Sequence, residues 1–386
     1  MTKYPIIHFL RSAMVAHWLI AFLAVACVIG GCLPSASSFQ TSLPFIVLLA
    51  TLLLHLSLVL FHRLRRHDIK RDWTFLATHL GIWLALLSGM AGAGCDKTLR
   101  AIISQKGMTT EAIDADGYVN RLPYSLQLQD FHIETNATDG SPMQYSATVL
   151  VDGKPAVIAV NSPYSVNIAE DIYLMDYSDE ANGTVCLMTI ERQPLKYAML
   201  AGICLLLVGS VFYGIRKLKR RSFIIVAAGF IFIYLLQPGI HDPGLAPVLR
   251  SAWFTPHVAA YMFSYCIFGC AFLLAVAGLL RRNGDYLRST DLLVGIGMAF
   301  LTFGMLSGCI WAKQAWGSYW TWDPKETWAA ATWCAYLMYI HRRLSTTGSH
   351  VINYIWLIFG FLIIQMCWYG INFLPSAVGS LHRYSM

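Results

Sequence analysis

Long apolar runs, separated by short charged segments, make up most of this chain. A helix that crosses a lipid bilayer needs about 20 mostly apolar residues. Only 13% of the residues are charged, well below the usual share in soluble domains. We therefore predict a mainly α fold, a polytopic membrane helix bundle of about nine transmembrane helices, of which the fifth and eighth are short. The predicted spans are residues 13–33, 44–62, 73–91, 196–215, 222–238, 256–280, 290–311, 328–341 and 351–373.

Basic clusters at alternate ends of these spans predict their orientation. Loops rich in Lys and Arg face the cytoplasm. The N-terminal tail and the loops near residues 63–71, 216–221, 281–288 and 342–343 hold 17 of the 28 basic residues but only 4 of the 21 acidic ones. One orientation satisfies every loop, with the N-terminus inside and the C-terminus outside. The net charge of +7 is thus a topology signal and gives no reason to expect nucleic-acid binding. The first run is interpreted as a retained helix, because it is long and no small-x-small cleavage site follows it.

The orientation leaves one sizeable polar segment outside, residues 92–195. Alternating apolar and polar residues at 124–129, 145–151 and 156–160 are typical of strands. Asp152-Gly153 between two of these runs is a hairpin turn signal. We expect a small antiparallel β domain. Whether Cys32, Cys95 and Cys186 include a disulfide pair stays open at this stage.

A second outer segment, between the seventh and eighth spans, is unusually rich in Trp. Aromatic belts occur at membrane interfaces, but a belt does not need six Trp in one short stretch that a charged turn interrupts. The segment therefore predicts a platform for a large flat ligand. Its Trp residues are Trp311, Trp316, Trp320, Trp322 and Trp328, with Trp333 just beyond.

Two histidines flank this segment on the same side. His257 begins the sixth span, and His382 lies in the C-terminal tail. For one interfacial histidine a structural role would be the simpler reading. Two imidazoles opposed across a plane, with aromatic residues around them, are what a bis-His heme site requires. The conjunction with the Trp segment favours ligation.

Another two histidines lie toward the cytoplasmic side. His79 is about two turns into the third span, and His341 ends the eighth. Ionisable residues inside a bilayer are costly and usually functional, and the two could meet if these helices pack together. A polar contact between helices for His79 and an interfacial position for His341 are equally good interpretations. His55 is interpreted as structural, and His17 as interfacial.

The charged turn within the Trp segment has both a structural and a functional interpretation. Asp323-Pro324 is typical of a helix N-terminus, and Glu326 then lies in the first turn, where the helix dipole favours acids. Lys313, Lys325 and Arg383 are outer cations suited to pair with heme propionates.

The Trp segment supports a resemblance to a known family. Trp316-Gly-Ser-Tyr-Trp320-Thr-Trp322-Asp-Pro-Lys-Glu-Thr-Trp328 resembles the WWD signature of heme-handling proteins, in the form of the CcsA (ResC) branch. Residues 370–384 resemble the terminal element of that branch, with Ser380 where the pattern has Gly. The Thr78–Gly81 segment and residues 130–163 resemble CcsB (ResB), although the β domain is shorter than is usual.

This resemblance implies a compact CcsB–CcsA fusion, a cytochrome c synthase of the bacterial inner membrane. It implies that heme b binds at two sites, and that two thiols of an apocytochrome CxxCH motif add to the heme vinyl groups. Thioredoxin-like proteins that reduce thiols fit as further partners. The implied iron ligands are His79 and His341 toward the cytoplasm and His257 and His382 outside. Implied catalytic residues are His257, His382 and Asp323, and implied heme-contacting residues are Trp316, Trp320, Trp322, Trp328 and Lys325.

The expected domains follow from the same reading. Residues 1–91 form three CcsB-like helices, 92–195 the β domain, 196–215 a fourth helix, and 216–386 the CcsA-like part with the WWD loop at 311–328. One alternative function is a heme exporter or chaperone that hands heme to a separate ligase, although such proteins lack a CcsB-like half. A quinol-oxidising cytochrome b is weaker, because only His55 and His79 lie deep in predicted spans.

Overall fold

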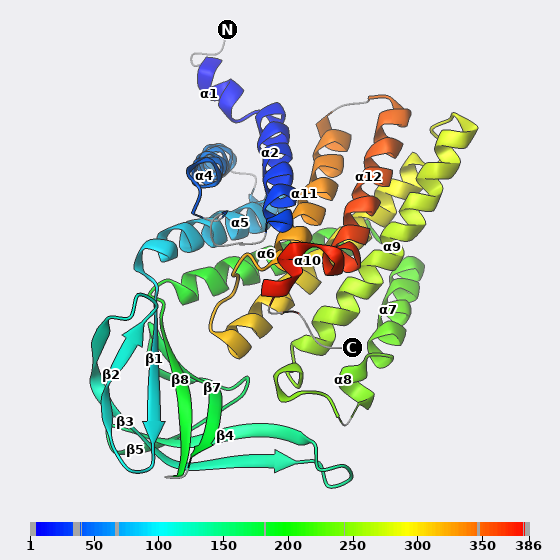
Figure 1. Ribbon diagram of the computed structural model, residues 1–386. Helices are drawn as coiled ribbons and strands as arrows, with labels where there is room; N and C mark the ends of the chain where they lie inside the picture. Colours follow the sequence, from blue (N-terminus) through cyan, green and yellow to red (C-terminus); the bar gives the residue numbers. More distant parts are fainter. Residues whose placement is uncertain are drawn as a thin grey trace.

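The computed structural model describes residues 5–33, 39, 41–65, 69–180, 183–242, 244–345, 348–380 and 382. Its helices form one bundle, and its strands form one sheet at the end of that bundle (Figure 1). The helices are α1 (Pro5–Leu10), α2 (Ala13–Cys32), α4 (Leu43–Arg65), α5 (Ile69–Cys95), α6 (Lys196–Lys217), α7 (Arg220–Leu235), α8 (Pro238–His241), α9 (Phe254–Arg281), α10 (Leu287–Trp316), α11 (Pro324–Ser345) and α12 (His350–Trp368), with short 3-10 turns η1 (Pro247–Leu249), η2 (Gly370–Phe373) and η3 (Pro375–Gly379).

Seven of the described helices are long and apolar enough to span a membrane: α2, α4, α5, α6, α9, α10 and α12. This confirms a multi-pass helical protein, while the predicted count of nine spans is supported for seven. The other two predicted spans correspond to α7 and α11. Of these, α7 has only 16 residues, and α11 is rich in Trp, Tyr, Thr and Ala rather than in large aliphatic residues.

Helix α10 is the centre of the bundle. Buried residues make up 61% of its apolar span, against 17–39% in the other six spans. It packs against α9, α6 and α11, and α11 in turn packs against α2 and α12. Among the seven apolar spans, the most buried is therefore the one that leads directly into the Trp-rich segment.

The sheet has eight strands and is antiparallel throughout, as predicted for this segment. The strand order is β5-β4-β3-β2-β1-β8-β7-β6, and β5 also contacts β6 and β7, so the sheet curls toward closure. The strands are β1 (Lys97–Ser104), β2 (Thr109–Asp114), β3 (Val119–Thr135), β4 (Pro142–Val151), β5 (Lys154–Ala159), β6 (Tyr164–Asn167), β7 (Glu170–Glu180) and β8 (Gly183–Arg192).

The alternation of apolar residues explains why this segment folds as a sheet. In β1, Leu99, Ala101 and Ile103 point into one core while their neighbours are exposed. Asp152 and Gly153 both have positive φ, at 49° and 74°, and join β4 to β5 in a two-residue turn. The predicted hairpin is confirmed, because this turn requires left-handed backbone at both central positions.

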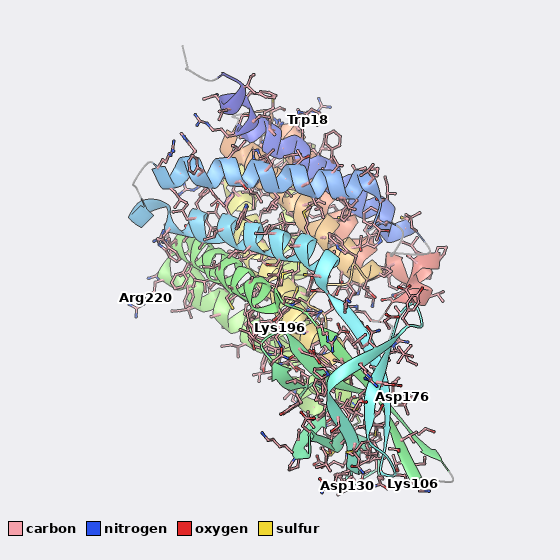
Figure 2. All side chains as sticks on the ribbon, turned by 90° about the vertical axis from the view of Figure 1, so that its left-hand side faces the viewer. Trp18, Lys106, Asp130, Asp176, Lys196 and Arg220 are labelled. Carbon is pink, nitrogen blue, oxygen red and sulfur yellow. The ribbon has the colours of Figure 1, made fainter. Side chains whose placement is uncertain are left out.

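The sheet defines two ends of the bundle. At one end, Lys196 begins α6 at the junction between helices and sheet (Figure 2). Arg220, which begins α7, lies at the opposite end (Figure 2). These are the sheet-side end and the far end below. All ten cysteines are free thiols, so Cys32, Cys95 and Cys186 form no disulfide.

Candidate functional site

The Trp loop, residues 311–328, includes the turn that joins α10 to α11, and side-chain hydrogen bonds hold this turn. Asp323 caps α11: its Oδ1 accepts a hydrogen bond from the Lys325 N–H at 2.8 Å. The Glu326 carboxylate accepts from the Asp323 N–H at 3.1 Å and from the Thr321 N–H at 2.8 Å. This reciprocal arrangement is a capping box, with Pro324 at the first helical position. The structural interpretation of the Asp-Pro-Lys-Glu turn is confirmed.

The same Asp323 carboxylate also orients His382. Its Oδ1 lies 3.2 Å from His382 Nδ1 and accepts a hydrogen bond from Ser380 Oγ at 3.0 Å. Ser380 Oγ in turn accepts the backbone N–H of His382 at 3.2 Å. Since a carboxylate only accepts, Nδ1 carries the proton and the lone pair is on Nε2. A carboxylate behind an imidazole is the usual support of a metal-binding histidine.

His257 is positioned differently, by two glycines that lie one turn apart on α10. Its Nδ1 lies 2.7 Å from the carbonyl oxygen of Gly304, so this ring also carries its proton on Nδ1. A Cβ atom at Gly308 would come within 2.5 Å of the same Nδ1. Gly304 therefore supplies the acceptor, and Gly308 supplies the space. The sequence prediction missed both glycines, although their four-residue spacing is the helix-packing pattern that would have found them.

Trp311 brings the two outer histidines together. Its ring centre lies 5.9 Å from that of His257 and 6.0 Å from that of His382. The indole is fully buried, and its N–H donates to the Val248 carbonyl at 3.0 Å. Trp316 packs on Trp311 at 4.8 Å between ring centres and on His382 at 5.3 Å. The predicted histidine pair thus shares one aromatic wall.

The remaining predicted Trp residues are placed differently from one another. Trp320 and Trp322 are edge to face at 5.7 Å, and Trp322 has φ 58°, an uncommon backbone for a bulky residue. Trp328 is buried against α2, where its N–H donates to the Gly31 carbonyl at 3.2 Å. Six Trp side chains therefore do not form a single flat platform; Trp311 and Trp316 form the wall at the histidines.

The three predicted propionate partners also differ in their placement. Lys325 reaches the C-terminal segment, and its Nζ donates to the His382 carbonyl at 3.2 Å. Lys313 is buried, and its Nζ lies 3.0 Å from Asp171 and donates to Gln193 Oε1 at 2.7 Å, so the sheet holds its charge. Arg383 lies outside the described residues.

A buried polar junction fixes the Trp loop to the sheet. Asp171 on β7 binds Lys196 at 2.6 Å as well as Lys313, which joins the ends of α6 and α10 through one carboxylate. Burial alone would raise the pKa of Asp171, but the hydrogen bonds from Lys196 and Ser165, together with the charge and hydrogen bond of Lys313, hold the pKa below its ordinary value. Such a buried network is stable only while all its members are paired.

Glu191 on β8 touches the start of the Trp loop. A Cβ atom at Gly317 would lie 2.7 Å from Glu191 Cγ, and Gly317 has φ 86°, so both contact and conformation require glycine there. Burial raises the pKa of Glu191 to about 7, against the effect of the hydrogen bond from Thr98. The junction thus includes an acid that titrates near neutral pH.

Asn161 makes a second connection between sheet and bundle. It sits after β5 with φ 61°, and its Nδ2 donates to the carbonyls of Pro247 and Val248, each at 3.0 Å. Val248 is also the acceptor for the Trp311 indole. The sheet therefore contacts the segment that positions Trp311, the indole that touches both outer histidines.

The two inner histidines are oriented by their own helices. His79 Nδ1 lies 2.9 Å from the Phe75 carbonyl, and His341 Nδ1 lies 2.9 Å from the Leu337 carbonyl. Close packing of α5 on α6 at Gly81, where a Cβ would meet the Leu206 backbone at 2.5 Å, positions the His79 helix. All four predicted ligands therefore carry the proton on Nδ1, and among the described residues none of their Nε2 atoms has a hydrogen-bond partner.

The condition under which His79 and His341 could meet, close packing of their two helices, is replaced by a different arrangement. Helix α2 packs on α11, and α2 also contacts α4 and α5 through the cluster around Leu19, Leu52 and Leu56. It therefore lies between the two histidine helices (Figure 1). His79 and His341 remain within electrostatic range of each other.

Fold and site define a class: a multi-pass helical protein in which two histidines, His257 and His382, contact one buried indole at the sheet-side end of the bundle. The profile of the "Cytochrome C assembly protein" family matches residues 193–378, and that of the "ResB-like family" matches residues 68–200. The chain belongs to the CcsA family of cytochrome c biogenesis proteins, joined here to a ResB-like region.

Three relatives show the extent of this similarity. The "Cytochrome c biogenesis protein CcsA" of Cuscuta exaltata is 32% identical over 224 residues, which cover 46% of this chain and 70% of the relative. The protein of that name from Chlamydomonas reinhardtii is 36% identical over 36% of this chain and 42% of its own length. That from Nymphaea alba is 31% identical over 42% of this chain and 65% of its own. The chain thus spans less than two thirds of the latter two.

Proposed function

We propose that this protein acts in cytochrome c biogenesis by receiving heme b and attaching it covalently to the CxxCH cysteines of apocytochrome c. The observation that carries this proposal is the outer histidine pair. His257 and His382 lie against one indole, with ring centres about equally far from it; each has its Nδ1 proton hydrogen-bonded, and no described residue binds its Nε2. Heme and apocytochrome are both substrates in this account.

The outer site contributes chiefly by positioning. Two neutral imidazoles with fixed tautomers suit the two axial positions of one heme iron. Asp323 and Gly304 hold the two rings in orientation, and Trp311 and Trp316 supply apolar surface for a flat macrocycle. When heme is held in a fixed orientation, the entropy cost of aligning it for reaction is met by the binding step. This lowers the barrier to the later reaction with the cysteine.

The bond chemistry is an addition without net oxidation. For each cysteine, a sulfur–carbon bond forms to one vinyl carbon, the S–H bond breaks, and its proton goes to the other vinyl carbon as the double bond is lost. The cysteines must therefore arrive as thiols, and thiol-reducing proteins of the thioredoxin class are the proposed source. The histidine of the CxxCH motif then replaces one protein ligand, which favours release.

The membrane arrangement belongs to the same proposal. Helices α7 and α11 complete nine spans in the bacterial inner membrane, with the N-terminus in the cytoplasm and the C-terminus outside. Residues 1–91, 92–195, 196–215 and 216–386 are the proposed domains. The sheet-side end, which carries His257 and His382, is then extracytoplasmic, where apocytochromes c are matured.

The test is coexpression with a reporter apocytochrome in a bacterial host that lacks its own assembly system. Heme that stays on the reporter after denaturation is the expected result, and an AxxAH reporter is the matched control. If the chain accumulates with heme but the reporter carries none, the covalent step is wrong and a heme exporter or chaperone is the better description.

A further inference from the structure

A third imidazole lies at the inner site. His17, near the start of α2, has its ring centre 6.3 Å from that of His341, with the ring planes perpendicular. His17 Nδ1 lies 3.1 Å from the Ala13 carbonyl, so its proton is on Nδ1 and its Nε2 carries a lone pair, as in the four predicted ligands. From its position in the sequence, His17 is predicted only to lie at the membrane interface.

The contact is a continuation of a packed helix interface. Ile20 on α2 packs against Cys334 and Met338 on α11. His17 is one turn before Ile20, and His341 is almost one turn after Met338, so both project from the faces that already meet. The pairing therefore follows from the antiparallel packing of α2 on α11, which Figure 1 shows side by side.

The separation of the rings matches a metal-bridged pair. A metal–imidazole bond is about 2 Å and the nitrogen lies about 1.2 Å from its ring centre, so two rings on opposite sides of one iron have centres about 6.4 Å apart. The observed 6.3 Å agrees. No ring contact of this kind links His341 to His79 among the described residues, although His79 lies within electrostatic range.

We propose that His17 is a heme-ligating residue of the inner site, and that it forms an axial pair with His341 for which His79 is the alternative partner. This inference rests on the proposed heme-handling function. With His17, His79 and also His55 within electrostatic range of the inner histidines, the iron can exchange one partner while His341 remains bound. The inner site would then receive heme with one pair and pass it on with another.

The test uses the full chain with the outer site removed by His257→Gly and His382→Gly and the alternative inner partner removed by His79→Gly, so that only heme held by His17 and His341 contributes to the spectrum. In this background, His17→Gly is expected to convert six-coordinate low-spin heme to a five-coordinate form and to weaken heme retention about 10-fold or more, since even the loss of an outer-shell partner costs 10–100-fold. Added imidazole should restore the low-spin spectrum. His350→Gly removes another histidine at the far end, whose ring contacts Tyr354, and is expected to leave the spectrum unchanged.

Folding and ligation are separated by a second variant. His17→Asn keeps a polar side chain of similar size, so it should accumulate like the background chain and still lose the low-spin signal. If the background chain, which lacks His79, shows no low-spin heme, or if both His17 variants keep its spectrum and heme content, the inference is overturned and the proposed function stands. If the unaltered chain binds no heme at all, the proposed function itself fails.

Discussion

At the sheet-side end, His257 and His382 are oriented by groups 47 and 59 residues away in the chain, the Gly304 carbonyl and the Asp323 carboxylate. At the far end, His79 and His341 are oriented by carbonyls four residues back in their own helices. The outer rings are therefore fixed by tertiary structure, whereas each inner ring follows the rotation of a single helix.

This difference shows how histidine can serve two tasks, the fixed presentation of heme at one end and the exchange of heme ligands at the other. A ring held by remote groups keeps one position, which suits a site that must present a substrate edge to a second protein. A ring held only by its own helix, with His17 close to His341, suits a site that exchanges ligands. The predictions below test whether the outer site is rigid and the inner site permissive.

The largest expected effect comes from removing the outer ligands. His257→Gly or His382→Gly should lower reporter cytochrome maturation about 100-fold or more, because loss of a ligand exceeds the 10–100-fold cost of losing its support. Added imidazole should restore part of the activity. Heme staining of the reporter gives the measurement, with His132→Gly on the sheet as control; full maturation in both variants would remove these residues from the ligand set.

A smaller loss of maturation, though still a large one, is expected from replacing Gly308, which leaves the space that the His257 ring occupies. Gly308→Ala places a methyl group 2.5 Å from His257 Nδ1, so the ring must move out of position. Maturation should fall about 10-fold or more, since small displacements of a reacting group are costly. Gly269→Ala on α9 is the matched control, because its nearest contact is 3.6 Å. Equal activity of the two variants would show that the outer ring is not rigidly seated.

Asp323 both caps α11 and orients His382. A substitution that keeps the first role and removes the second is expected to have a moderate effect on heme retention. Asp323→Asn keeps a good helix N-cap but removes the negative charge behind His382, so outer heme retention should weaken about 10-fold. Ser380→Ala keeps the carboxylate and should cost less, about 1 kcal/mol. Heme loss to apomyoglobin measures both. A larger loss in Ser380→Ala than in Asp323→Asn would contradict the assigned roles.

The smallest expected effect is a pH dependence confined to the outer end. Because burial raises the pKa of Glu191 to about 7 from 4.5, the folded protein binds this proton more tightly than the unfolded chain. Its contribution to stability is thus full below about pH 4.5 and is lost as the pH rises to about 7.

Glu191→Gln should remove this slope. Between pH 5 and 8, the thermal midpoint of the detergent-solubilised chain should fall less in the variant than in the unaltered protein. Outer heme should loosen with rising pH in the unaltered protein, while inner heme is unaffected. An identical slope in both proteins would place the titrating group elsewhere.

The sequence predicted the fold where a single local pattern decides it. Apolar length located the helices, and alternation with Asp152-Gly153 located the sheet and its turn. It could not show which helices touch: α2 between the histidine helices is a consequence of side-chain packing across the bundle. The capping box was predictable because all its members lie within six residues.

The site was predictable in its residue types but not in its geometry. The orientation predicted from the sequence places His257 and His382 on one side of the membrane, but only the fold shows that both rings contact Trp311. The roles of Gly304, Gly308 and Ser380 depend on contacts between distant segments. For His17 the sequence predicts only an interfacial position, because a single histidine near a helix end does not show which residue it contacts in the fold.

The most direct test of the rigid outer site is the absorption spectrum of purified protein from which His17, His79 and His341 have been replaced by Gly. With heme added, we predict a six-coordinate low-spin spectrum that becomes five-coordinate in His257→Gly and in His382→Gly and returns with imidazole. A low-spin spectrum that persists unchanged in both variants would contradict the central claim that these two histidines hold heme at the outer site.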